Sequence, residues 1–137
     1  AHILRSQEVM EDFPALLNIE MNGHKLETFV LFGLPELDQV LALDRPLHQR
    51  VAVRYEVTAL NSPGTEAYIK FRLRIAGAQE SLFKPETFPL ICHYSKGIPR
   101  LINTLCDNAL LEAYLRKQDR IEMGLIHEVA EDLKLNQ

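Results

Sequence analysis

The chain has 137 residues, of which 47% are hydrophobic and 25% are charged, which is typical of one ordinary domain or two small pieces. Its 15 basic and 19 acidic residues leave a net charge of -4, which argues against a broad nucleic-acid-binding surface but leaves a local basic face open. The longest apolar runs are far shorter than a membrane span, and no signal-peptide pattern occurs. We therefore expect a cytoplasmic protein.

Residues 1–57 have the mixture of helical and strand patterns that is typical of an α/β fold. The predicted elements are, in chain order, a helix over residues 6–17, a turn at Asn22-Gly23, a strand at residues 26–32, a short helix from Pro35 and a strand at residues 51–57. The segment between the two strands is long enough for a crossover connection, so the strands are expected to run parallel.

Beyond a polar segment at residues 58–63, every pattern predicts helix. The first helix begins at Ser62-Pro63 and ends at Gly77, with Tyr68, Phe71 and Ile75 expected to face inward and Lys70, Arg72 and Arg74 at least partly outward. Three more helices are expected from about residue 84, from Pro99 and from about Arg120. The sequence therefore predicts a four-helix module at residues 58–137.

The helix from Pro99 has an arginine, Arg100, in its first turn. Proline suits the first helical position, but the N-terminal end of a helix has a partial positive charge and several unpaired N–H groups. An arginine there is unfavourable unless a phosphate or carboxylate binds to the arginine and to the helix N-terminus together. The alternative is a surface arginine that is retained for the packing of its aliphatic stem.

The two cysteines, Cys92 and Cys106, lie in helical patterns without a CxxC motif or a Cys/His cluster. Buried reduced thiols are therefore expected rather than a disulfide or a zinc site, and no metal site is predicted. No serine or cysteine nucleophile is placed beside a base, so the chain has no catalytic constellation of its own.

Four segments, taken in order, carry a resemblance to a known family. They are FVLFGLPEL at residues 29–37, LHQRV at 47–51, YIKFRLRIAG at 68–77 and GIPRLIN at 97–103. Together they resemble the AAA+ ATPases of the general secretion pathway protein A type, essentially from end to end. The resemblance implies an α/β plus α fold, with an incomplete P-loop core at residues 1–57 and a four-helix lid at residues 58–137.

In that family a Walker A loop and a Walker B strand precede these segments, and Ala1-His2 resemble the end of the Walker B motif. The resemblance thus implies the C-terminal part of a longer ATPase. Neither Walker motif occurs in the 137 residues, so we expect this part to be inactive alone and to hold no tightly bound cofactor. ATP and Mg²⁺ would bind to the full-length protein.

The resemblance also implies roles for single residues. Arg100 matches the sensor 2 arginine, which reaches from the lid to the γ-phosphate, and Gly97, Ile98 and Pro99 would approach the nucleotide beside it. This agrees with the independent electrostatic argument for Arg100.

Arg50 matches the arginine finger, the catalytic residue that stabilises charge on the nucleotide of a neighbouring subunit. The alternatives are a surface arginine, or Arg54 in the same role. Leu34 stands where the family often has a polar sensor 1 side chain, which leucine cannot replace.

The implied function is the coupling of ATP binding and hydrolysis to rearrangement of a cell-envelope complex. The full-length protein would form a homo-oligomer at the cytoplasmic face of the inner membrane, with an inner-membrane secretion partner. A related ATPase of polysaccharide export or protein sorting is equally compatible. The alternatives from other classes are a helical protein-interaction module and a DNA-binding regulator of the transposition or replication type, whose contact would be Lys70, Arg72 and Arg74.

In the core that this chain resembles, a central strand lies between the two predicted strands, and that strand is absent from the chain. The two strands must then pair directly or recruit strands from another copy. We expect a dimer or larger assembly through the α/β part.

Overall fold

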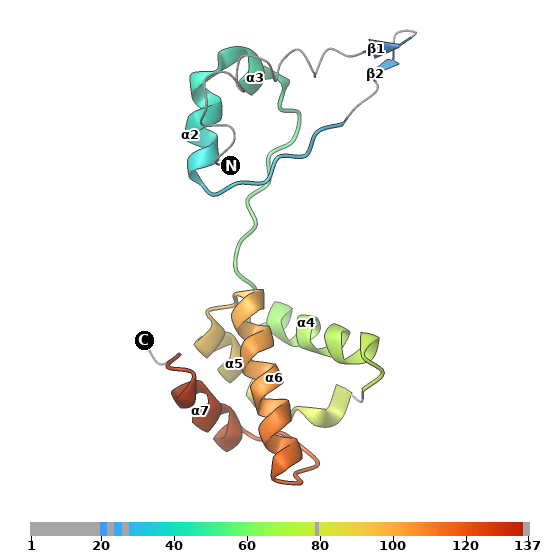
Figure 1. Cartoon of the computed structure of the whole chain (residues 1–137), viewed down its shortest axis with the longest axis vertical. Helices are drawn as coiled ribbons and strands as arrows, with labels where there is room; N and C mark the ends of the chain where they lie inside the picture. The colour runs from blue at the N-terminus through green and yellow to red at the C-terminus, as the bar shows by residue number, and fades with distance from the viewer. Residues whose placement is uncertain (1–19, 22–23, 26–27, 79, 136–137) are drawn as a thin grey trace. The chain divides into compact units, whose positions relative to one another are not determined.

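The computed structural model describes residues 20–21, 24–25, 28–78 and 80–135 (Figure 1). The chain divides into two compact units, residues 1–56 and 57–137. The helix expected over residues 6–17 and the turn at Asn22-Gly23 lie outside the described residues. The assignment of the units to a nucleotide-binding core and a lid stays a prediction.

In its described residues, the first unit contains a short antiparallel pair and two helices. Strands β1 (Glu20–Met21) and β2 (His24–Lys25) pair with Glu20 opposite Lys25 and Met21 opposite His24. Helix α2 (Glu36–Leu43) begins directly after Pro35, as predicted.

Helix α3 (Arg45–Arg50) was not predicted. The sequence signal for the start of this helix is nevertheless local. The Asp44 side chain accepts a hydrogen bond of 3.0 Å from the Leu47 backbone N–H, which makes Asp44 the N-cap. Helices α2 and α3 contact each other, and each has one buried leucine, Leu41 and Leu47.

The two longer predicted strands do not form in the described residues. Residues 28–34 and 51–60 belong to neither helix nor strand, and Phe32 and Tyr55 are 83% and 87% exposed. An apolar alternation becomes a strand only where a neighbouring chain pairs with its N–H and C=O groups. The sheet of the described residues consists of β1 and β2, so direct pairing of the two segments as strands, one of the two expected outcomes, is also not observed there.

The second unit is helical, as predicted. It comprises α4 (Ser62–Ile75), the short 3₁₀ helix η2 (Glu80–Leu82), α5 (Thr87–Ser95), α6 (Pro99–Leu115) and α7 (Met123–Asp132). Helix α5 contacts α4, α6 and α7 (Figure 1). The core of this second unit is formed by apolar side chains from all four α-helices, among them Ile69, Ile91, Ile102, Leu105, Ala109 and Ile126.

The inward face of α4 differs from the prediction. Thr65, Ile69 and Leu73 are the buried residues of this helix. Of the residues predicted to face inward, Tyr68 is partly buried against the core, whereas Phe71 and Ile75 are 56% and 72% exposed. Residues four apart stack along one side of a helix, so the spacing of the buried set is regular. The predicted and the observed sets of inward residues both have helical spacing. Only the packing of α4 against the rest of the unit determines which set is buried.

The last helix begins three residues later than predicted, at Met123 rather than at Arg120. Ile121 instead forms a parallel bridge with Phe83. The Lys84 N–H donates to the Ile121 carbonyl at 3.0 Å, and the Ile121 N–H donates to the Leu82 carbonyl at 2.7 Å. These long-range bonds hold the chain extended before α7.

Candidate functional site

The loop that leads into α6 reverses the chain between Ser95 and Pro99. Lys96 and Gly97 have left-handed backbone conformations, with φ of 52° and 68°. The Gly97 N–H donates to the Cys92 carbonyl at 3.2 Å, and the Ile98 N–H donates to the Ser95 carbonyl at 2.9 Å. Such a left-handed turn satisfies the last carbonyls of α5 and sets the direction in which α6 begins.

Gly97 is also the place where the backbone of Leu60 approaches this loop. The Leu60 N–H donates to the Gly97 carbonyl at 2.8 Å, and a Cβ atom on Gly97 would lie only 1.9 Å from the Leu60 carbonyl oxygen. Gly97 is buried. The structure therefore gives Gly97 a packing role, and its predicted contact with a nucleotide remains a prediction.

The first turn of α6 is open to solvent. Its N-cap residue, Ile98, makes no side-chain capping bond, and the turn contains no acidic residue. Ile98 is 41% exposed, and Pro99 and Arg100 are exposed as well. Within the residues that the structure describes, the Arg100 guanidinium has no ion pair, so a cationic side chain and unpaired helix N–H groups face solvent together.

Arg50 is the last residue of α3 and is exposed. The guanidinium of the nearby Arg54 lies 3.5 Å from the His48 carbonyl oxygen. Arg50 belongs to the first unit and Arg100 to the second, so each is placed only within its own unit. Leu34 is exposed immediately before α2.

The three basic residues of α4 do not share one environment. Lys70 is half-buried, lies 2.7 Å from a Glu66 carboxylate oxygen and has its Nζ 5.5 Å from the centre of the Phe88 ring. Arg72 and Arg74 are exposed. Lys70 and Arg72 are separated by about 200° around the helix, so the three residues do not form one continuous basic face.

Both cysteines are free, and their environments differ. Cys106 is buried, and this burial, together with the neighbouring Asp107 carboxylate, raises the pKa of its thiol to about 12. Cys92 is half-buried, with its Sγ 3.7 Å from the Leu60 carbonyl oxygen. The expectation of buried thiols is therefore confirmed for Cys106 and only partly met by Cys92.

The described part of the chain contains no group of three His, Cys, Asp or Glu side chains that could hold a metal ion. None of the helices described is both long enough and apolar enough to cross a membrane.

Comparison with known proteins gives one informative similarity. No family model matches the chain, and no solved structure matches it. The chain is 41% identical over 118 residues to General secretion pathway protein A of Aeromonas hydrophila. The match covers 85% of this chain but 22% of that protein, so the chain spans about a fifth of the length of this relative. The resemblance to the general secretion pathway protein A type, which four segments of the sequence indicated, is confirmed.

Proposed function

We propose that this chain forms the end of the nucleotide-binding core and the helical lid of an AAA+ ATPase of the general secretion pathway A type. The observation that carries the proposal is the open first turn of α6, where Arg100 and uncapped N–H groups face solvent with no acidic residue beside them. The similarity to General secretion pathway protein A supports it. In the full-length protein, ATP-driven movement of the lid would rearrange a partner complex in the cell envelope.

The open turn fits a phosphate group better than any other part of a nucleotide. A helix N-terminus attracts negative charge through its partial positive charge and its free N–H donors, and a guanidinium can form two parallel hydrogen bonds to phosphate oxygens. Arg100 would thus bind the γ-phosphate and lose that partner when the phosphate leaves. We assign Mg²⁺ no ligand in the described part of the chain.

The test uses the full-length protein. Arg100→Ala should reduce ATP turnover at least about tenfold, because it removes a charged donor from the phosphate, and it should leave the fold intact, because the side chain is exposed. The matched control is Lys117→Ala, which removes an exposed cation beyond the other end of α6. Turnover of Arg100→Ala within about twofold of wild type would exclude a sensor role.

A second experiment tests Arg50 as an arginine finger that acts across a subunit boundary. An Arg50→Ala protein, mixed with a full-length protein that lacks its Walker A lysine, should regain part of the activity, because each subunit supplies the group that the other lacks. Arg54→Ala in the same mixture is the control for the neighbouring arginine. If assembly is verified and no mixing ratio restores turnover, Arg50 is a surface residue.

A further inference from the structure

Two contacts hold the start of α6 on either side of Arg100. The Leu60 N–H donates to the Gly97 carbonyl at 2.8 Å, before Arg100 in the chain. The Tyr68 hydroxyl donates to the Asn103 side-chain oxygen at 3.1 Å, after Arg100 in the chain. Both donors belong to one segment, residues 60–68, which contains the start of α4. This segment therefore holds both ends of the turn that carries Arg100.

The two contacts connect this turn to the core of the helical unit. Leu60 and Tyr68 are partly buried and pack against the hydrophobic core. Gly97 is buried, and an added Cβ on it would lie 1.9 Å from the Leu60 carbonyl oxygen, so the Leu60 backbone lies directly against the loop. Partial burial shields both hydrogen bonds from water.

Arg100 itself has no comparable support. Its side chain is exposed, and its guanidinium has no ion pair within the described part of the chain. A group that acts on a phosphate must be placed accurately, since a displacement of about 1 Å can cost about 100-fold in rate. The placement of this guanidinium thus depends on what fixes the backbone of residues 97–103.

We propose that Leu60, through its backbone N–H, and Tyr68, through its hydroxyl, are positioning residues for Arg100. They fix the first turn of α6 so that the guanidinium meets the γ-phosphate, and neither of them touches the nucleotide. This inference rests on the proposed nucleotide role of Arg100. If the two contacts only stabilised the helical unit, their loss would lower stability without an effect on turnover that depends on Arg100.

Tyr68→Phe in the full-length protein tests the hydroxyl. The ring that packs on the core is kept, so the fold should be retained, and ATP turnover at saturating ATP should fall about fivefold, the effect of one lost hydrogen bond. In an Arg100→Ala protein the same change should alter turnover less than about twofold, because the group that Tyr68 positions is gone.

Two control variants accompany Tyr68→Phe. Tyr114→Phe removes a hydroxyl from an exposed side chain near the other end of α6. Arg72→Ala removes the guanidinium that lies 3.5 Å from the Tyr68 hydroxyl. Both controls should keep turnover within about twofold of wild type.

The Leu60 N–H is tested by an ester bond in place of the peptide bond before Leu60, which removes this donor and keeps the side chain. Turnover should again fall about fivefold, and only in the presence of Arg100. The control is the same ester before Ala59, whose N–H makes no hydrogen bond within the described residues.

Hydrogen exchange of the 137-residue chain gives a measurement without nucleotide. The Ile102 N–H donates to the Ile98 carbonyl at 2.9 Å, a bond that closes the first turn of α6. Tyr68→Phe should increase exchange at Ile102 about fivefold, because the turn opens more often, and Tyr114→Phe should not.

The proposal is overturned if Tyr68→Phe and the Leu60 ester keep turnover within about twofold of wild type, or if they lower it equally with and without Arg100. Unchanged turnover in Arg100→Ala alone overturns the nucleotide role, and the positioning for a phosphate with it. Faster exchange at Ile102 would then show that the two contacts still hold the turn, which distinguishes the two failures.

Discussion

Gly97 combines a left-handed backbone with a neighbouring main chain that leaves no room for a side chain. Its φ is 68°, and the Leu60 carbonyl oxygen would be 1.9 Å from an added Cβ. The comparison with Gly77 separates these two effects, since Gly77 also has a positive φ, of 73°, but nothing lies within 4 Å of its added Cβ.

Gly97→Ala should therefore lower the free energy of unfolding by about 2–4 kcal/mol, the sum of backbone strain and overpacking. Gly77→Ala should lower it by about 1–2 kcal/mol, from backbone strain alone. Urea denaturation of the whole chain measures both. Equal losses in the two variants would show that Leu60 does not pack on Gly97 in solution.

Cys106 should differ from Cys92 in reactivity and in its effect on stability. Burial raises the pKa of the Cys106 thiol from 9.0 to about 12, and only the thiolate is nucleophilic, so iodoacetamide should modify Cys92 much faster. The unfolded chain releases the Cys106 proton above about pH 9 while the folded chain retains it up to about pH 12. The free energy of unfolding should thus fall as the pH rises above about 9.

The measurement is urea denaturation at about pH 8 and about pH 10, together with mass spectrometry of the alkylated peptides. Cys106→Ala should show a smaller loss of stability between the two pH values than the wild-type chain does. The same loss in both would mean that other groups cause the pH dependence.

At the scale of elements, the helices of the second unit could be predicted because their signals are local. Pro99 lies at the first position of α6, and Gly77 follows the end of α4 with a positive φ. Pro89 is tolerated inside α5 because it lies in the first turn, where N–H groups have no helical partner. The place of Arg100 in the first turn of α6 was predicted from the same local signal, the proline before it.

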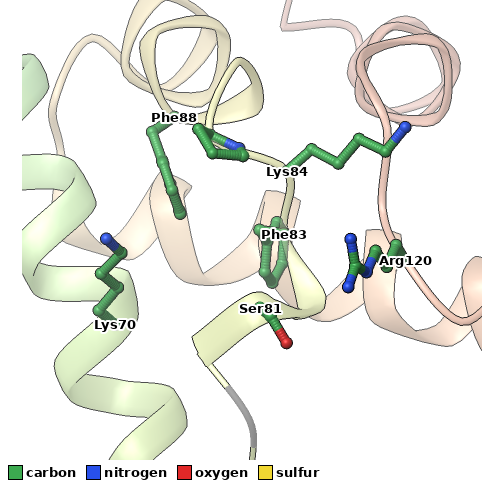
Figure 2. Close-up of a pocket in the computed structure, with 7 residues that line it drawn as sticks. Lys70, Ser81, Phe83, Lys84, Phe88 and Arg120 are labelled. Carbon is green, nitrogen blue, oxygen red and sulfur yellow. The ribbon is translucent and has the colours of Figure 1, made fainter.

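What could not be predicted depends on residues far apart in the sequence. Hydrophobic periodicity is satisfied by both stripes of α4, and only tertiary packing buries Ile69 rather than Phe71. The contact of Leu60 with Gly97 has no local pattern at all, and the surface pocket that Lys70 and Arg120 both line is formed by different elements (Figure 2). Strand formation at residues 51–57 likewise depends on a partner, which the alternation itself cannot supply.

The cap of α4 gives a test at this scale. The Asn61 side-chain oxygen accepts a hydrogen bond of 2.8 Å from the Gly64 N–H, whereas the adjacent Ser62 is the first residue of the helix. Asn61→Ala should lower the free energy of unfolding by about 1 kcal/mol, and Ser62→Ala by less than about 0.5 kcal/mol. Thermal and urea denaturation compare the two. A larger loss of stability in Ser62→Ala would show that Ser62, and not Asn61, caps the helix.

At the scale of the whole chain, the exposed apolar residues of the first unit are the basis for the expected assembly. Phe32, Val53 and Tyr55 are 82–87% exposed and lie in segments that form neither helix nor strand, and exposed apolar groups favour association. We expect the chain to form a dimer or larger assembly that light scattering detects as a concentration-dependent mass.

Replacement of Phe32, Val53 and Tyr55 by serine should return the mass to that of a monomer. The control is the pair Phe71→Ser and Ile75→Ser on the exposed side of α4, which should leave the assembly unchanged if association uses the first unit. A wild-type chain that stays monomeric at high concentration contradicts the expected assembly. An effect of the α4 pair alone would place the interface on the helical unit.

The bridge between Phe83 and Ile121 has a consequence for how the helical unit opens. Its hydrogen bonds join the segment before α5 to the segment before α7, so their formation closes a long loop and costs conformational entropy. We expect the amide protons of Lys84 and Ile121 to exchange at similar rates, because opening of this bridge breaks both hydrogen bonds at once. Exchange at these two amides should be slower than exchange at the ends of the helices, which open through smaller, local fluctuations.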